Sequence, residues 1–186
     1  MIFDLLNKSK NEQKIIRIWF YGEEEMYWCG YVKNVKEKLF FLQHFTKFGK
    51  PDGLLSEQIE NIESIDFDND FSKTMEYLIK YPDLIDKEPK IDLEITEEDN
   101  WQFEILDSQL GLKDRLITIQ INGDRFYNGI IEWIDEGYLI LNKVGEEGQD
   151  EGKSIFIIDD INAIQINNLE NRKRLLLYKL RKANKF

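Results

Sequence analysis

Hydrophobic and polar positions alternate in two segments that lie about a hundred residues apart. In the later segment, ITIQI at 117–121, an isoleucine occupies every second position, and a turn-forming Gly123 follows between Asn and Asp. The earlier segment, IRIWF at 16–20, has the same alternation and is followed by Gly22. A period of two predicts a strand with one buried face, and the glycine predicts a tight turn. Each segment therefore predicts a strand that turns back into a second strand.

The two segments belong to a longer internal repeat. From Gly30 and Gly129 onward the copies are 99 positions apart and need no gap as far as Asn69 and Asn168. The matched glycines are Gly22 with Gly123, Gly30 with Gly129, Gly49 with Gly148, and Gly53 with Gly152. We interpret this match as a duplication, although two antiparallel meanders of independent origin can also look alike.

The repeat predicts two domains. Residues 1–81 form the first, residues 103–186 form the second, and each ends in a segment of helical character. The acidic stretch 82–102 between them contains two prolines, which is typical of a linker, with an added strand at 90–95 as an option. At the end of the second domain, Leu169, Leu176 and Leu180 predict the apolar stripe of a helix.

The order of these predicted elements resembles the Sm-like family, whose fold is a small, strongly bent barrel of the SH3-like kind. In the second copy, Gly129, Ile131 and Asp135 stand where the first Sm motif has its glycine, apolar residue and aspartate. The resemblance implies a mainly β protein with a minor α part. It would consist of two tandem SH3-like or Sm-like five-stranded bent barrels, each with a flanking helix. Other SH3-like barrels, such as PRC-barrel-type domains, give much the same pattern.

The residues with which Sm-like proteins read RNA are not matched. The family has an Asn where this chain has Phe40 and Leu139, and an Arg-Gly or Lys-Gly step where it has IENI at 59–62 and IDDI at 158–161. A carboxylate that faces a phosphate repels it. The resemblance therefore implies the fold without the RNA-reading residues, and a fold by itself does not carry a function.

Charge is distributed unevenly along the 186 residues, whose net charge is −11. Residues 1–170 carry 18 Lys or Arg against 36 Asp or Glu, and the last 16 residues carry no acid. The basic residues of this tail are Arg172, Lys173, Arg174, Lys179, Arg181, Lys182 and Lys185. An acidic body repels polyphosphate. The tail either reverses this repulsion locally or docks on the acidic surface of its own chain.

Candidate catalytic and metal-ligating residues are sparse. The single cysteine, Cys29, excludes an internal disulfide and a cysteine-based zinc site. His44 is the single histidine, so Cys29 with His44 is the one nucleophile–base pair to consider; the alternative is two ordinary strand residues. The run DFDND at 66–70 lacks the glycine and glutamate of a calcium loop. We therefore expect no enzyme, no cofactor and no metal.

Large aromatic residues at outward strand positions are the candidate binding residues. On the first strand these are Arg17, Trp19 and Tyr21, and the second copy has Thr118, Gln120 and Asn122 in their places. At another position the second copy has the aromatic residue, Trp133, and the first copy has the polar residue, Asn34. The chain itself can cover these residues, through the sister barrel, the linker with Trp101 or the C-terminal helix. The alternative is that they bind a partner, since Trp, Tyr and Arg are enriched in interface hot spots.

These features favour a non-enzymatic protein-binding module. Its acidic body would bind a basic protein, as an immunity or inhibitor protein does with a cationic toxin. The alternative is a nucleic-acid-associated protein of Sm-like ancestry that uses the basic tail, residues 172–185. The sequence shows no secretory signal and no membrane-length apolar run, so we expect a cytoplasmic protein without a membrane contact. Its composition suggests a bacterium, and its oligomeric state is left open.

Overall fold

The computed structural model describes residues 1–22, 26–87, 90–91, 93–96 and 98–183, which form two compact units, Met1–Asp83 and Leu84–Phe186. The first unit contains α1 (Ile2–Glu12), β1 (Ile16–Phe20), β2 (Tyr27–Val35), β3 (Leu39–Phe45), β4 (Pro51–Gln58), η1 (Ile59–Asn61), β5 (Ile62–Phe67) and α2 (Asp70–Lys80), before η2 (Pro82–Leu84). The second contains η3 (Glu98–Asn100), α3 (Trp101–Asp107), β6 (Ile117–Ile121), β7 (Arg125–Ile134), β8 (Tyr138–Val144), β9 (Asp150–Ile157), η4 (Ile158–Asp160), β10 (Ile161–Ile166) and α4 (Leu169–Lys182).

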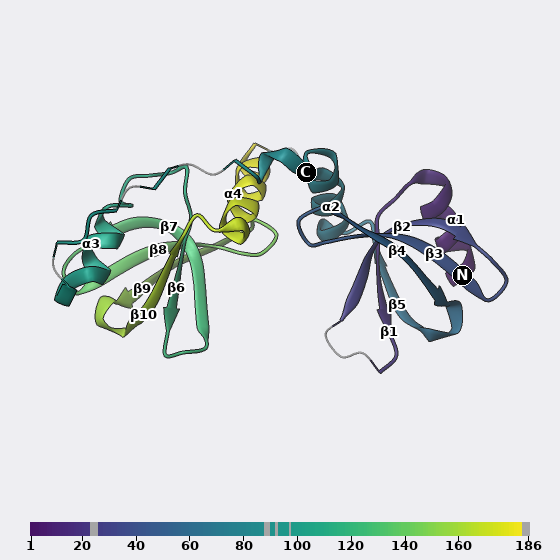
Figure 1. The fold of residues 1–186 in the computed structure, drawn as a ribbon, viewed down its shortest axis with the longest axis horizontal. Helices are drawn as coiled ribbons and strands as arrows, with labels where there is room; N and C mark the ends of the chain where they lie inside the picture. The colour runs from purple at the N-terminus through teal and green to yellow at the C-terminus, as the bar shows by residue number, and fades with distance from the viewer. Residues whose placement is uncertain (23–25, 88–89, 92, 97, 184–186) are drawn as a thin grey trace. The chain divides into compact units, whose positions relative to one another are not determined.

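Each unit is a bent antiparallel sheet with a helix before it and a helix after it (Figure 1). The strand order is β4-β3-β2-β1-β5 in the first sheet and β9-β8-β7-β6-β10 in the second. The prediction of a mainly β protein with flanking helices is confirmed. Hydrogen bonding leaves β4 and β5 as the edges of one sheet and β9 and β10 as the edges of the other, so neither sheet closes into a barrel.

The two units share the register of their strands. Ile16 pairs with Gly30 in the first sheet, and Ile117 pairs with Gly129 in the second. A Cβ atom on Gly30 would lie 1.8 Å from the carbonyl oxygen of Gln43, and one on Gly129 would lie 2.3 Å from that of Asn142. The neighbouring strand therefore passes too close for any side chain at this position, which explains why both copies have glycine there.

One face of each sheet forms the core. In β1 and β6 the residues predicted to point inward are buried, and the core of the first unit comprises Leu6, Ile16, Ile18, Phe20, Val32, Phe40, Leu42 and Ile62. Leu6 of α1 is fully buried against this face, as Leu106 of α3 is in the second unit. The helix that precedes each sheet thus contributes one leucine that completes the core.

The helix that follows each sheet begins in the same way in both units. Asp68 and Asn167 adopt left-handed backbone conformations, with φ of 53° and 52°. The next residue in each copy, Asn69 or Asn168, caps the helix: its side chain accepts from the backbone N–H of the third residue on, at 3.0 and 2.8 Å. Such an N-cap satisfies one of the N–H groups left without a partner at the helix start.

Most of the acidic stretch between the repeats, from Leu84 onward, belongs to the second unit. Ile85 is fully buried, and its carbonyl oxygen accepts a hydrogen bond from Arg172 Nε at 2.7 Å. Residues 90, 91 and 93–95 are not in a strand, so the optional strand at 90–95 is wrong for the positions that the structure describes.

We expect Gly148→Ala to lower the free energy of unfolding by about 3 kcal/mol, because it combines left-handed strain with overpacking. Gly148 has a φ of 75°, and a Cβ atom there would lie 2.5 Å from the backbone of Leu177 in α4. Gly152 is the control, since it has a φ of 74° but open space around it, and Gly152→Ala should cost about 1 kcal/mol. Urea unfolding measures both, and equal losses would contradict the contact between the β8–β9 loop and α4.

Candidate functional site

Arg17 and Trp19, on the outward face of β1, lie in a cluster of aromatic and charged side chains. Arg17 Nε donates to Asp66 Oδ2 at 2.9 Å, and Trp19 Nε1 donates to the same oxygen at 3.0 Å. The Arg17 guanidinium lies 4.3 Å from the ring centroid of Phe71, at the start of α2. Tyr27 packs between Trp19 and Phe71, with ring centroids 5.0 and 5.6 Å away. The first unit therefore covers both residues itself, although each stays partly exposed.

The strand register places Asp66 in this cluster. Arg17 is directly opposite Asp66 in the β1–β5 pair, and Trp19 is opposite Tyr27 in the β1–β2 pair. Burial by itself raises the pKa of the Asp66 carboxyl, but the hydrogen bonds from Trp19 and Arg17, together with the charge of Arg17, outweigh burial and hold this pKa below its usual value. Asp66 is thus an anion that joins β5 to two side chains of β1.

The other two candidate binding residues lie elsewhere. Tyr21 is 67 % exposed in the turn after β1, and Trp133 is 46 % exposed on β7 of the second unit. The structure therefore brings two of the four candidates together, and neither Tyr21 nor Trp133 belongs to that cluster. A binding role for these residues stays a prediction.

Trp133 lies in an apolar patch on the outer face of the second sheet. Pairing across β7, β8 and β9 aligns Trp133 with Ile140, and Ile140 with Ile155. Tyr138 and Ile157 form the next row of the same face, since they pair directly and are two positions from Ile140 and Ile155. Ile155 and Ile157 are 67 % and 50 % exposed. We call these five residues the outer patch.

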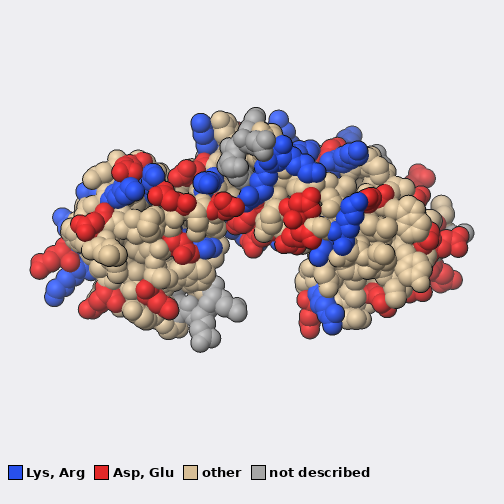
Figure 2. All heavy atoms as spheres, turned by 180° about the vertical axis from the view of Figure 1, so that it is seen from behind, with Lys and Arg blue, Asp and Glu red and all other residues tan. Residues whose placement is uncertain are grey.

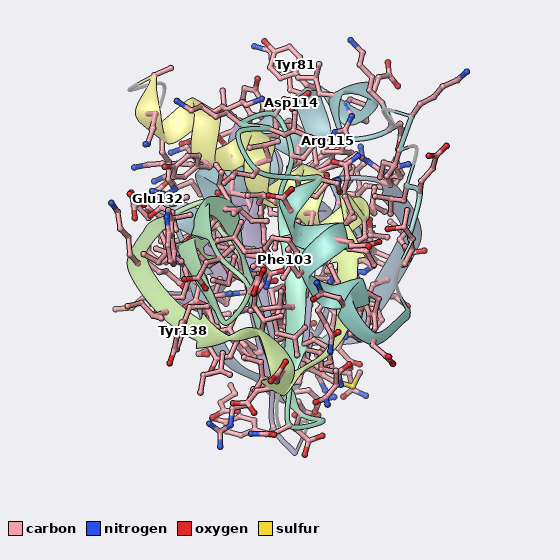
Figure 3. All side chains as sticks on the ribbon, turned by 90° about the vertical axis from the view of Figure 1, so that its left-hand side faces the viewer. Tyr81, Phe103, Asp114, Arg115, Glu132 and Tyr138 are labelled. Carbon is pink, nitrogen blue, oxygen red and sulfur yellow. The ribbon has the colours of Figure 1, made fainter. Side chains whose placement is uncertain are left out.

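A shallow hollow adjoins the outer patch at Tyr138. It has a volume of about 530 Å³ and is lined by Phe103, Asp135, Glu136, Gly137 and Tyr138. Figure 3 shows Phe103 on α3 and Tyr138 on the adjoining part of the sheet. Asp135 Oδ1 accepts from the backbone N–H groups of Gly137 and Tyr138 at 2.8 and 2.7 Å, which fixes the carboxylate in the turn. Two aromatic rings and two carboxylates suit a guanidinium or ammonium group.

The first unit has a different surface at the equivalent positions. The outer patch of the second unit corresponds to Asn34, Leu39, Phe41, Ser56 and Gln58, and Asp135 corresponds to Lys36. Because both units share one frame, this difference arises from side chains alone. The apolar patch and the acidic hollow are therefore specific to the second unit.

Most cations of the basic tail hold α4 against its own unit. Lys173 is 2 % exposed, and its Nζ lies 3.7 Å from carboxylate oxygens of both Glu146 and Glu170. Arg174 Nη1 donates to the carbonyl oxygen of Val144 at 3.1 Å. Arg181 Nε donates to that of Glu147 at 2.7 Å, as Arg172 does to Ile85. Lys179 and Lys182 are exposed, and Lys185 lies outside the described residues.

The buried face of α4 differs from the predicted stripe. Leu180 is buried as expected, but Leu169 and Leu176 are only half-buried. The residues that α4 buries are Asn171, Lys173, Leu175, Leu177, Tyr178 and Leu180. Two of these are polar or charged, so a stripe drawn through leucines alone could not find this face.

Both ring nitrogens of His44 face groups other than the Cys29 thiol. His44 Nδ1 donates to the backbone carbonyl oxygen of Cys29 at 3.0 Å, and its Nε2 lies 3.7 Å from Asp52 Oδ2. The Cys29 side chain is 2 % exposed. The imidazole thus links the backbone of β2 to the start of β4, which is the arrangement of two ordinary strand residues.

Within the described residues, no group of three or more His, Cys, Asp or Glu side chains is arranged to hold a metal ion. No helix in that part of the chain has the length and apolar character needed to cross a bilayer.

Comparison of the chain with family models, with curated proteins and with solved structures gives no match. The Sm-like resemblance therefore stays a prediction, and the function has to be inferred from the surfaces described above.

The outer patch could have been found from the sequence by comparing the copies further. At the 99-residue offset, Ile155 and Ile157 stand against Ser56 and Gln58 on alternate positions of one strand, which marks an apolar outer face in one copy only. The partners of Trp19, by contrast, come from strand pairing, and no local signal in the sequence points to Asp66.

We expect Asp66→Asn to destabilise the protein at neutral pH but not in acid. Because the folded-state pKa of Asp66 is lowered, its stabilising effect is present above the unfolded-state value, about 3.9, and is lost as the pH falls through the folded-state pKa. Urea midpoints of the wild type and the variant should therefore converge on acidification. Glu63→Gln, at an exposed position of the same strand, is the control. A difference between wild type and Asp66→Asn that stays constant with pH would contradict the ionic role of Asp66.

Replacement of Lys173 should show that the basic helix is anchored within its own unit. Lys173→Ala leaves Glu146 and Glu170 without this cation and should cost about 2 kcal/mol in the free energy of unfolding. Lys179→Ala, at an exposed position two turns later, should change it by less than about 0.5 kcal/mol. Thermal unfolding of both variants is the measurement, and an unchanged Lys173→Ala protein would contradict the anchoring.

Proposed function

We propose that the chain is a non-enzymatic protein-binding module whose second unit binds a basic protein through the outer patch and the adjoining acidic hollow. The observation that carries this proposal is the exposure of Trp133, Ile155 and Ile157 beside a hollow with two carboxylates. An immunity or inhibitor protein that neutralises a cationic toxin is the concrete form of this function.

The apolar part of the surface supports a protein as the partner. Exposed tryptophan and isoleucine side chains in adjoining rows provide area that a partner can desolvate, and tryptophan is among the residues enriched in interface hot spots. The row from Trp133 to Ile155 crosses three strands, so these side chains are held on a rigid sheet. Little conformational entropy is then lost on binding.

The charge of the chain supports a basic partner. The net charge is −11, and on the face drawn in Figure 2 acidic side chains are spread over both units. Four cations of the basic tail are engaged within the second unit (Arg172, Lys173, Arg174 and Arg181), so that some of their donor groups are already used within the chain. An acidic surface accelerates association with a cationic protein and makes the rate sensitive to salt.

The hollow provides a specific position for one cationic side chain. Asp135 is fixed by two backbone hydrogen bonds, and Phe103 and Tyr138 lie beside it. An Arg or Lys of the partner would lie against aromatic rings and pair with a carboxylate at once. The first unit has Lys36 in the place of Asp135, so only the second unit would accept that cation.

The test begins with a tagged pull-down from the native lysate, with and without nuclease, followed by affinity measurements on the protein recovered. We expect a basic protein whose dissociation constant rises by at least about thirtyfold with Trp133→Ser, which corresponds to about 2 kcal/mol. Ile155→Ser should weaken binding less, and higher salt should slow association.

Leu54→Ser is the matched control, because Leu54 is 62 % exposed on the edge strand of the first unit and lies outside the proposed surface. Binding that is insensitive to both Trp133→Ser and salt would overturn the proposal. Recovery of nucleic acid that is lost on nuclease treatment or on deletion of residues 171–186 would instead support the nucleic-acid-associated alternative.

A further inference from the structure

The second unit contains a second, larger cavity, which is not part of the proposed protein-binding surface. It has a volume of about 760 Å³ and lies between the loop after α3, the strands β7 and β8, and the last turns of α4. Leu110, Ile130 and Leu175 supply apolar walls. Leu175 is 6 % exposed and belongs to the small core that joins α4 to the sheet. The apolar part of the cavity is therefore a fixed feature of the fold.

Three lysines surround this cavity. Lys113 comes from the loop after α3, and Lys179 and Lys182 come from α4. Among the residues that the structure describes, none of the three forms an ion pair with a carboxylate, although the charge of Asp150 acts on Lys182. One acidic residue, Glu132, also lines the cavity, but its carboxylate is 2.5 Å from Lys153 Nζ. The lining thus carries a surplus of positive charge in a chain that is acidic as a whole.

The helix end itself does not cancel this surplus. The C-terminus of a helix carries about half a negative charge, which is smaller than the charge of the three lysines. Hydrogen bonding and electrostatic attraction from Tyr178, together with the charge of Asp150, raise the pKa of Lys182 above its ordinary value.

The hydroxyl of Tyr178 adds a directional donor. Its oxygen accepts from Asn142 Nδ2 at 3.3 Å, and Lys182 Nζ lies 4.5 Å from the centroid of its ring. Because a phenol carries one proton, a hydroxyl that accepts from Asn142 can still donate to an acceptor. A carboxylate or phosphate oxygen in the cavity would provide that acceptor and face the lysines at the same time.

At the corresponding described positions the first unit has different side chains. Tyr31 stands where Ile130 does, and its ring lies 5.4 Å from that of Phe45. Glu76 replaces Leu175, and Asp83 replaces Lys182. The same frame therefore carries aromatic and acidic side chains in one copy, and apolar and basic side chains in the other.

We propose that the cavity between β7, β8 and α4 binds a small organic anion, with its charged group at Lys113, Lys179 and Lys182 and its apolar body against Leu110, Ile130 and Leu175. The two kinds of lining select an amphiphilic ligand over either a free inorganic anion or a neutral apolar molecule. This site is separate from the outer patch, so the proposal stands or falls independently of the protein partner.

The experiment titrates the full chain with 1-anilinonaphthalene-8-sulfonate, a fluorescent amphiphilic anion, and with its neutral analogue N-phenyl-1-naphthylamine. We expect one saturable site for the anion per chain and binding of the neutral analogue that is at least about tenfold weaker, since a charge-assisted contact contributes about that factor. The double variant Lys179→Ser/Lys182→Ser should weaken anion binding by about tenfold or more. Inorganic phosphate at equal concentration should not displace the probe.

Lys80→Ser is the matched control, because Lys80 is the counterpart of Lys179 in the first unit and is likewise exposed; it should leave binding unchanged. Leu110→Gln, at a half-exposed wall position, tests the apolar part with little risk to folding and should also weaken binding. Near-ultraviolet circular dichroism of each variant excludes dye binding to a misfolded state. Equal affinity for the neutral analogue, displacement by phosphate, or a double variant that binds as the wild type does would overturn the proposal.

Discussion

Each unit depends on the burial of one face of one five-stranded sheet. The inward residues of the strands, together with a single leucine from the preceding helix, form the core, and the following helix starts from an asparagine cap. Gly30 and Gly129 permit the close strand approach that this arrangement requires. These constraints act on the inner face and the turns, while the outer face is free of them. The outer face is therefore where the two copies differ.

The difference between the constrained inner face and the unconstrained outer face explains how much of the fold could be predicted from the sequence. Alternation and matched glycines are local signals, and they were sufficient for the order of the elements and for the mainly β class. Whether the sheets close is decided by pairing between distant strands, which no local pattern contains. The buried face of α4 was missed for a related reason: Asn171 and Lys173 are buried because specific partners satisfy them, with Asn171 Nδ2 donating to the carbonyl oxygen of Leu116 at 3.2 Å, so hydropathy alone assigned the face to other residues.

The candidate site was predictable in part. Trp19 and Trp133 stood out because the other copy has Gln120 and Asn34 in their places, and such a contrast needs no structure. What surrounds each of them is set by strand register, which includes an irregularity between Ile131 and Trp133. Trp19 consequently has a carboxylate, a guanidinium and the ring of Tyr27 beside it, whereas Trp133 has a row of isoleucines. The charge of the basic tail could be counted from the sequence, whereas its use within the second unit depends on loops that fold back onto α4.

The open edge of the second sheet has a consequence for the behaviour of the molecule in solution. β9 combines edge backbone groups with two exposed isoleucines, and such a strand is a template for pairing with a second chain. The strong negative charge keeps copies apart by mutual repulsion. That repulsion vanishes near the isoelectric point, about 4.7, where colloidal stability is lowest. The net negative charge thus opposes self-association at this edge at neutral pH.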